Sequence, residues 1–226
     1  MKRHFEGELE SLQTSLIKMG SVVEEAVKRS IKAFLERDES LARLVIEQDE
    51  RVNSLEIEID NAIIDLLALQ QPVAIDLRLI LAVQKINNDL ERIGDHAVNI
   101  AESALTLVQL PTQGTLLEIP EMAKVAQSML RNALDGFIHR DARLGRAVLL
   151  QDDVIDELNR KTVTGFVKMM KGDQNTIDAG LDLIRISRNL ERVADLSTNI
   201  AEEVIFMAQA RVVKHHAGED EPGSQS

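Results

Sequence analysis

Acidic side chains recur with a spacing of four residues in two segments of the chain that resemble each other. NNDLERIGDHAVNIAE occupies 87–102 and SRNLERVADLSTNIAE occupies 187–202, and half of their positions are identical. Each segment keeps a glutamate followed four residues later by an aspartate, namely Glu91, Asp95, Glu191 and Asp195. Like charges four apart on a helix repel each other by about 0.2–0.5 kcal/mol. Because both copies keep the pair while other positions have changed, the pattern predicts a carboxylate surface with a function.

Further carboxylates stand at the same height on the helix that precedes each of these segments. Counted from the turn that joins the two helices, Asp49 is level with Glu91, and Asp152 and Asp156 are level with the second pair. Antiparallel packing would bring these acids together beside the apolar seam, exposed to solvent. Asn53 stands where the second copy has Asp156, which predicts a weaker site in the first copy.

Such a surface predicts cation binding, because carboxylate oxygens are the ligands that hard metal ions prefer. The donor set suits Mg²⁺, Ca²⁺, Mn²⁺ or iron and does not distinguish among them. It suits Zn²⁺ least, since structural zinc sites prefer thiolate and imidazole. The alternative interpretation is a solvated acidic helix face that binds nothing. The predicted metal ligands are Asp49, Glu91, Asp95, Asp152, Asp156, Glu191 and Asp195.

The composition excludes several classes of protein. The chain has 38 acidic and 26 basic residues, and its net charge of -12 would repel nucleic acid and anionic membrane surfaces. It has no cysteine and therefore no disulfide or thiolate site. Neither a signal peptide nor a membrane-spanning apolar run is evident, which predicts a cytoplasmic protein. The five histidines are scattered and no Gly-rich phosphate loop occurs, so we expect no enzyme.

The spacing of apolar residues predicts helices almost throughout. Apolar side chains recur every three or four residues, without the sustained alternation of a strand. Proline, glycine and helix N-cap residues such as Asp38 and Asp141 mark the helix ends. The charged, unpatterned tail over 213–226 predicts disorder. The six expected helices cover 8–36, 39–69, 73–109, 120–139, 142–171 and 175–212.

The two halves of the chain align beyond the acidic segments. AFLERDES at 33–40 matches GFIHRDAR at 136–143, so the repeated unit contains three helices. Short connections make consecutive helices antiparallel. We therefore expect an all-α fold, a tandem repeat of two pseudo-symmetric antiparallel three-helix bundles with six long helices. Each half should fold as its own bundle, with a first repeat over 1–110, a linker over 111–119 and a second repeat over 120–212.

QQPVAIDLRLI at 70–80, together with the paired LERIGDHAVNIAE and LERVADLSTNIAE, closely resembles the PhoU family over about 8–212. The resemblance implies a non-enzymatic cytosolic regulator of phosphate uptake, often a homodimer. Such a protein restrains the phosphate-starvation response by linking the Pst phosphate transporter, through its ATPase subunit PstB, to the sensor histidine kinase PhoR. In some members of the family the paired carboxylates bind iron or other metals.

Two other interpretations compete with this one. A ferritin-like di-iron oxidase would need Glu-x-x-His motifs, but Gly94 and Ala194 stand where the histidines would be, and the acids face outward. The other alternative is a structural or scaffolding helical bundle, or a carboxylate metal-binding protein with a different partner. Elemental analysis separates the scaffold from the metal-binding protein, whereas the phosphate assignment depends on the resemblance.

Overall fold

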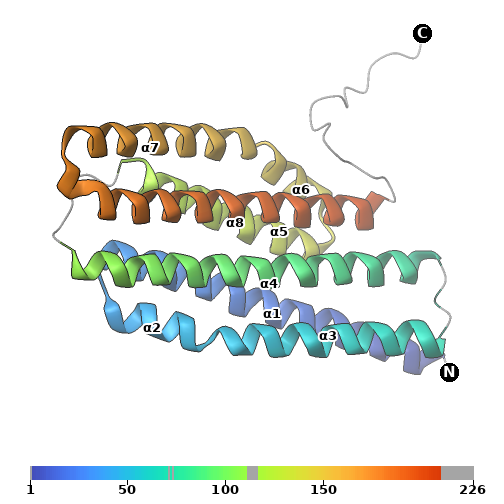
Figure 1. Ribbon diagram of the computed structural model, residues 1–226. Coiled ribbons are helices and arrows are strands. Elements are labelled where there is room, and N and C mark those ends of the chain that lie inside the picture. The colour runs from blue at the N-terminus through green and yellow to red at the C-terminus, as the bar shows by residue number, and fades with distance from the viewer. Residues whose placement is uncertain (1, 71, 73, 111–116, 210–226) are drawn as a thin grey trace, which may run out of the picture.

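The computed structural model describes residues 2–70, 72, 74–110 and 117–209, and within them it is helical with no strand (Figure 1). The all-α prediction and its six long helical stretches are confirmed, although two of the stretches are each divided. Most of the predicted linker and the whole predicted tail lie outside the described residues. The helices are α1 (Lys2–Glu36), α2 (Glu39–Glu47), α3 (Asp49–Gln70), α4 (Ala74–Gln109), α5 (Ile119–His139), α6 (Ala142–Leu149), α7 (Asp152–Gly172), the short 3₁₀ helix η1 (Gln174–Thr176) and α8 (Ile177–Gln209).

The divided stretches break at matching positions of the two repeats. The backbone N–H of Arg51 bonds to the carbonyl of Gln48 at 3.1 Å, and that of Val154 bonds to Gln151 at 3.2 Å. These are three-residue turns instead of the four-residue turns of an α-helix. Acidic residues follow each break, and the partial positive charge at a helix N-terminus favours them there. A new helix therefore begins at Asp49 and at Asp152, each of which follows a glutamine and precedes a second acid.

The connection that enters each divided stretch is also the same in both repeats. Arg37 and Arg140 adopt left-handed backbone angles, with φ of 56° and 51°, and so end α1 and α5. Asp38 then accepts a hydrogen bond from the backbone N–H of Leu41 at 3.0 Å, and Asp141 accepts one from Arg143 at 2.9 Å. Both predicted N-caps are confirmed.

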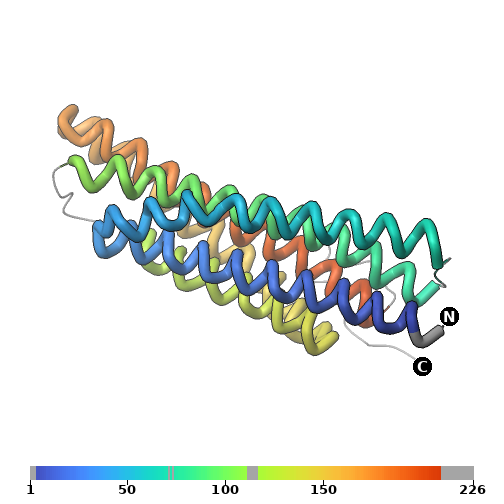
Figure 2. The backbone as a smooth tube through the Cα atoms, turned by 90° about the horizontal axis from the view of Figure 1, so that it is seen from below, coloured from blue at the N-terminus to red at the C-terminus, as the bar shows by residue number. Residues whose placement is uncertain are grey.

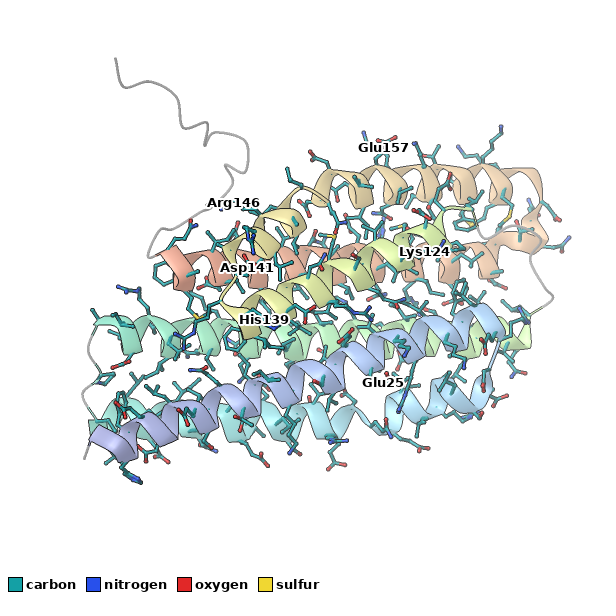
Figure 3. All side chains as sticks on the ribbon, turned by 180° about the vertical axis from the view of Figure 1, so that it is seen from behind. Glu25, Lys124, His139, Asp141, Arg146 and Glu157 are labelled. Carbon is teal, nitrogen blue, oxygen red and sulfur yellow. The ribbon has the colours of Figure 1, made fainter. Side chains whose placement is uncertain are left out.

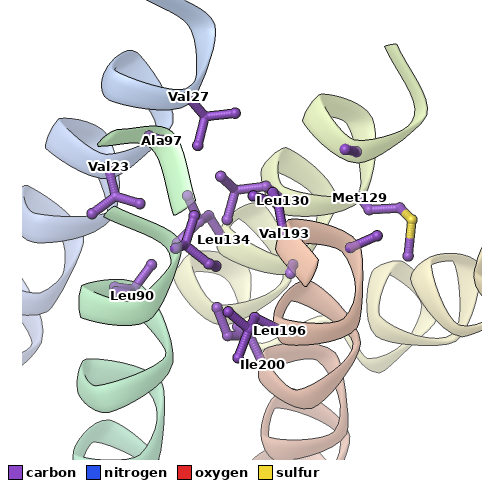
Figure 4. Packing of buried hydrophobic residues seen from close by; sticks show 14 of the residues in the cluster. Val23, Val27, Leu90, Ala97, Met129, Leu130, Leu134, Val193, Leu196 and Ile200 are labelled. Carbon is purple, nitrogen blue, oxygen red and sulfur yellow. The ribbon is translucent and has the colours of Figure 1, made fainter. Parts of the chain in front are cut away.

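The two repeats pack side by side along α4 and α8, which run the length of the molecule between the outer helices (Figures 1 and 2). Helices α1 and α5 also meet across the boundary. The buried apolar residues form one continuous cluster that draws on both repeats. Figure 4 shows its centre, where Val23 and Leu90 of the first repeat approach Leu134 and Leu196 of the second. No helix among the described residues is long and apolar enough to cross a membrane.

Candidate carboxylate surface

The predicted ligands of the first repeat lie where α3 packs against α4. Asp49 is the first residue of α3, and Glu91 and Asp95 lie one turn apart in the middle of α4. Asp95 is exposed, as the sequence predicts, but Asp49 and Glu91 are half-buried. The difference arises because the stripe lies beside the seam between two antiparallel helices, so that the neighbouring helix partly covers it.

The pKa values of Asp49 and Glu91 are raised, in part by the charges of neighbouring carboxylates. Burial raises the pKa of Glu91, and the negative charges of Asp95, Glu56 and Asp49 raise it further. Burial also raises the pKa of Asp49, against the opposing effect of its hydrogen bond with Asn53. The fold therefore holds several negative charges together at some electrostatic cost.

Glu56 is a member of this group that sequence reasoning missed. It is half-buried on α3, and its pKa is raised by burial and then by the charges of Asp60 and Asp95. It follows Asp49 by seven residues, or two helical turns, so the two acids share a face of α3. That spacing was the signal that could have identified it.

The second repeat builds a similar group where α7 packs against α8. Asp152, Glu191 and Asp195 are half-buried and Asp156 is exposed. Burial, followed by the charges of Asp156 and Asp195, raises the pKa of Asp152, while a hydrogen bond donated by the Thr198 hydroxyl at 3.3 Å opposes the shift. Burial and the charge of Asp195 likewise raise the pKa values of Asp156 and Glu191.

The two carboxylate groups differ in the side chains that donate hydrogen bonds to them. In the first repeat the Asn53 amide donates a hydrogen bond to a carboxylate oxygen of Asp49 at 3.2 Å. In the second repeat the Arg192 guanidinium donates to Asp195 at 2.7 Å. The matching Arg92 is instead 3.8 Å from a carboxylate oxygen of Asp89. The first group therefore has the Asn53 amide where the second has the Asp156 carboxylate. The second group also has the Arg192 guanidinium beside Asp195.

The fit of this arrangement to a metal ion is incomplete. Among the described residues, no three carboxylate or histidine side chains converge as the ligands of a single ion would. The acids form a surface of negative charge instead of a preformed cage, so side chains would have to turn before three of them could share an ion. Metal binding by the predicted residues stays a prediction.

A second set of acids, also missed from the sequence, lies in the contact between the repeats. Asp89 of α4 and Glu203 of α8 are both buried, and the Lys85 ammonium pairs with Glu203 at 2.6 Å. Burial raises the pKa of Asp89 to about 6, and the charge of Glu203 adds to the shift. The Asn199 side chain, Arg92 and Lys85 oppose it. The helical pattern alone could not show that this polar face meets another helix.

Asp89→Asn should raise the free energy of unfolding at neutral pH. The pKa of Asp89 is about 6 in the folded protein, against an ordinary value of 3.8, so its ionised form opposes folding. The gain, about 1 kcal/mol after allowance for solvent screening, should be largest above the folded pKa. It should shrink as the pH falls through 6 and vanish below 3.8, where Asp89 is protonated in both states. Urea unfolding from about pH 8 to about pH 4 measures this; a pH-independent difference would contradict it.

Comparison with known proteins relates this architecture to one family. The PhoU domain family model matches the chain twice, over residues 16–104 and 119–204, so one copy lies on each repeat. A phosphate-specific transport system accessory protein PhoU homolog of Clostridium acetobutylicum is 32% identical over 213 residues, covering 94% of this chain and 97% of that protein. The homolog from Pseudomonas aeruginosa is 35% identical over 219 residues, covering 95% and 89%.

Solved structures agree with the sequence comparison. The crystal structure of PhoU from Pseudomonas aeruginosa superposes with a TM-score of 0.88 at 35% identity, covering 92% of this chain and 100% of that one. The phosphate transport system regulatory protein PhoU from Streptococcus pneumoniae superposes with a TM-score of 0.85 at 30% identity, covering 93% and 99%. Since both repeats match in sequence and in fold, the chain belongs to the PhoU family.

Proposed function

We propose that this protein is a cytoplasmic, non-enzymatic negative regulator of phosphate uptake and of the phosphate-starvation response. It acts as an adaptor between the phosphate-specific transporter, through its ATPase subunit PstB, and the sensor kinase PhoR, and it works as a homodimer. The observation that carries the proposal is the match of both repeats, over nearly the whole chain, to accessory proteins of the phosphate-specific transport system.

The surface chemistry supports an adaptor that contacts proteins. The net charge of -12 disfavours binding to DNA, so repression would act through protein contacts. Long helices leave extended faces for partners, and several large apolar side chains are exposed on them, for example Ile57 and Ile64 on α3. In the same proposal the two carboxylate groups attract cations or basic protein surfaces.

Deletion of the gene should make cells express the phosphate-starvation regulon even when phosphate is plentiful. The reason is that a restraint on the kinase operates only while transporter, adaptor and kinase are all present. The measurement is a reporter fused to a starvation promoter, read in high and in low phosphate, with a plasmid copy of the gene restoring repression as the control. Normal repression in the deletion strain would reject the proposed function.

A further inference from the structure

A groove of about 440 Å³ opens in the first repeat, where α1 passes the break between α2 and α3. Residues of α1 line it from Lys18 to Arg29, which corresponds to about 16 Å along the helix. Gly94 of α4 also lines it, and an added Cβ there would lie 3.2 Å from a methyl carbon of Val52. Figure 3 shows Glu25 on the edge of α1 that borders this region. The groove therefore extends along about three turns of α1 and is open to solvent.

Aliphatic side chains line the inside of the groove, and cationic side chains lie at its rim. Its apolar lining is made by Val22, Ala26, Val45, Val52 and Val98. Lys18, Arg29 and Arg51 also line it. Of these three, only Arg29 is engaged, bonding to Glu25 at 2.8 Å and to Gln48 at 2.9 Å. Within the described part of the chain, Lys18 and Arg51 form no ion pair.

Each of the two carboxylates that line the groove already accepts a hydrogen bond. Glu25 accepts from Arg29, and Asp49 accepts from Asn53 at 3.2 Å. The Ser21 hydroxyl donates to the carbonyl of Ile17 at 3.0 Å. The partner of Asp49 is a neutral amide, so Asp49 keeps its charge. The lining still has three cations (Lys18, Arg29 and Arg51) against two anions, a formal charge of +1, and it therefore offers a ligand aliphatic surface and a small excess of positive charge. A small polar metabolite would need converging hydrogen-bond donors and acceptors, which this lining does not supply.

The matching region of the second repeat has different residues. Met129, Ile155 and Ala194 stand where the first repeat has Ala26, Val52 and Gly94, and all three are fully buried. Each of these side chains is larger than its counterpart in the first repeat. At the rim, Glu121 and Val154 replace the two unpaired cations, Lys18 and Arg51. The residues of the groove therefore differ from their counterparts in the second repeat in both size and charge.

We propose that this groove binds a short extended segment of a partner protein, in which aliphatic side chains alternate with acidic ones. The aliphatic side chains would bury the valine-rich lining, and the acidic ones would pair with Lys18 and Arg51 at the rim. About five extended residues span the length of the groove at 3.3 Å per residue. The inference rests on the proposed adaptor role, because it assigns one surface through which an adaptor would hold a partner.

The test uses the purified full-length protein and a fluorescein-labelled peptide, acetyl-Asp-Leu-Glu-Leu-Asp-amide, in a fluorescence anisotropy titration. Ala26→Met, which copies the second repeat, should weaken binding about ten-fold or more by filling the groove. Ala68→Met, on the exposed side of α3, is the matched control and should leave binding unchanged. The Lys18→Glu and Arg51→Glu double variant should lose the acidic peptide and bind one in which lysine replaces the acids.

Two results would overturn the inference. One is the lack of any binding of the acidic peptide to the unaltered protein at millimolar concentration. The other is binding that survives both Ala26→Met and the double charge reversal, because the peptide would then lie elsewhere. Circular dichroism verifies that each variant remains folded. The assay contains neither kinase nor transporter, so its outcome is independent of the starvation-promoter experiment and the two proposals can fail separately.

Discussion

Leu196→Asp is expected to cost about 4 kcal/mol or more in the free energy of unfolding, a large part of the roughly 5–15 kcal/mol that is typical of a folded protein. Leu196 lies on α8 in the core between the repeats, with 2% of its surface exposed (Figure 4). A carboxylate there would lose an apolar contact and be buried without a cation. The measurement is urea unfolding followed by circular dichroism.

Leu181→Asp is the matched control, because Leu181 lies on the same helix but is 56% exposed. It should change stability by less than about 0.5 kcal/mol. Since one apolar cluster joins both repeats, the unaltered protein should unfold in a single transition that every probe reports alike. Equal effects of the two substitutions, or a separate early transition of one repeat in the unaltered protein, would contradict this account of the core.

Neutralising the carboxylate surface should abolish function while sparing the fold. In the quadruple variant Glu91→Gln, Asp95→Asn, Glu191→Gln and Asp195→Asn, the side chains keep their size but lose four charges. Because burial and neighbouring charges raise the pKa values of Glu91 and Glu191, their ionised forms oppose folding. Stability at neutral pH should therefore be unchanged or higher. We expect repression in high phosphate to be lost, as in the deletion strain.

The same quadruple variant tests cation binding. Elemental analysis and calorimetry with Mg²⁺, Mn²⁺ and iron on the unaltered protein should detect bound ions, and the variant should lose them. A variant that changes only the first pair should retain the second site, which has Asp156 where the first has Asn53. A stable variant that still represses would show that the surface is not functional. Metal-free unaltered protein would contradict cation binding while leaving a protein-binding role for the surface.

The sequence predicted the helices and their caps because those features depend on local contacts. Asp38 and Asp141 are such cases, since an N-cap binds the backbone of its own helix within a few residues. The divisions after Glu47 and Leu149 were not predicted. The apolar spacing continues across both breaks, so only the acidic residues that follow them could have indicated a new helix start.

The candidate site could be predicted only in part, for a related reason. The repeated spacing identified the paired acids of α4 and α8, and matching heights located Asp49 and Asp152 beside them. A helical wheel does not show the neighbouring helices. Glu91 is half-buried where α3 packs against α4, and Asp89 is buried where α4 packs against α8. Whether a polar residue is buried depends on contacts between helices that are distant in the sequence, and the spacing of residues along the chain does not reveal those contacts.

The uninterrupted length of α4 and α8 has a mechanical consequence. These helices have 36 and 33 residues, or about 50 Å each, whereas one outer stretch of each repeat is divided, into α2 and α3 and into α6 and α7. An unbroken ladder of backbone hydrogen bonds resists bending, whereas each break in an outer helix is a place where the chain can yield. A partner that pulls on α2 or α6 would therefore displace a short segment against a stiff central pair. We therefore expect α2 and α6 to move more readily than α4 and α8.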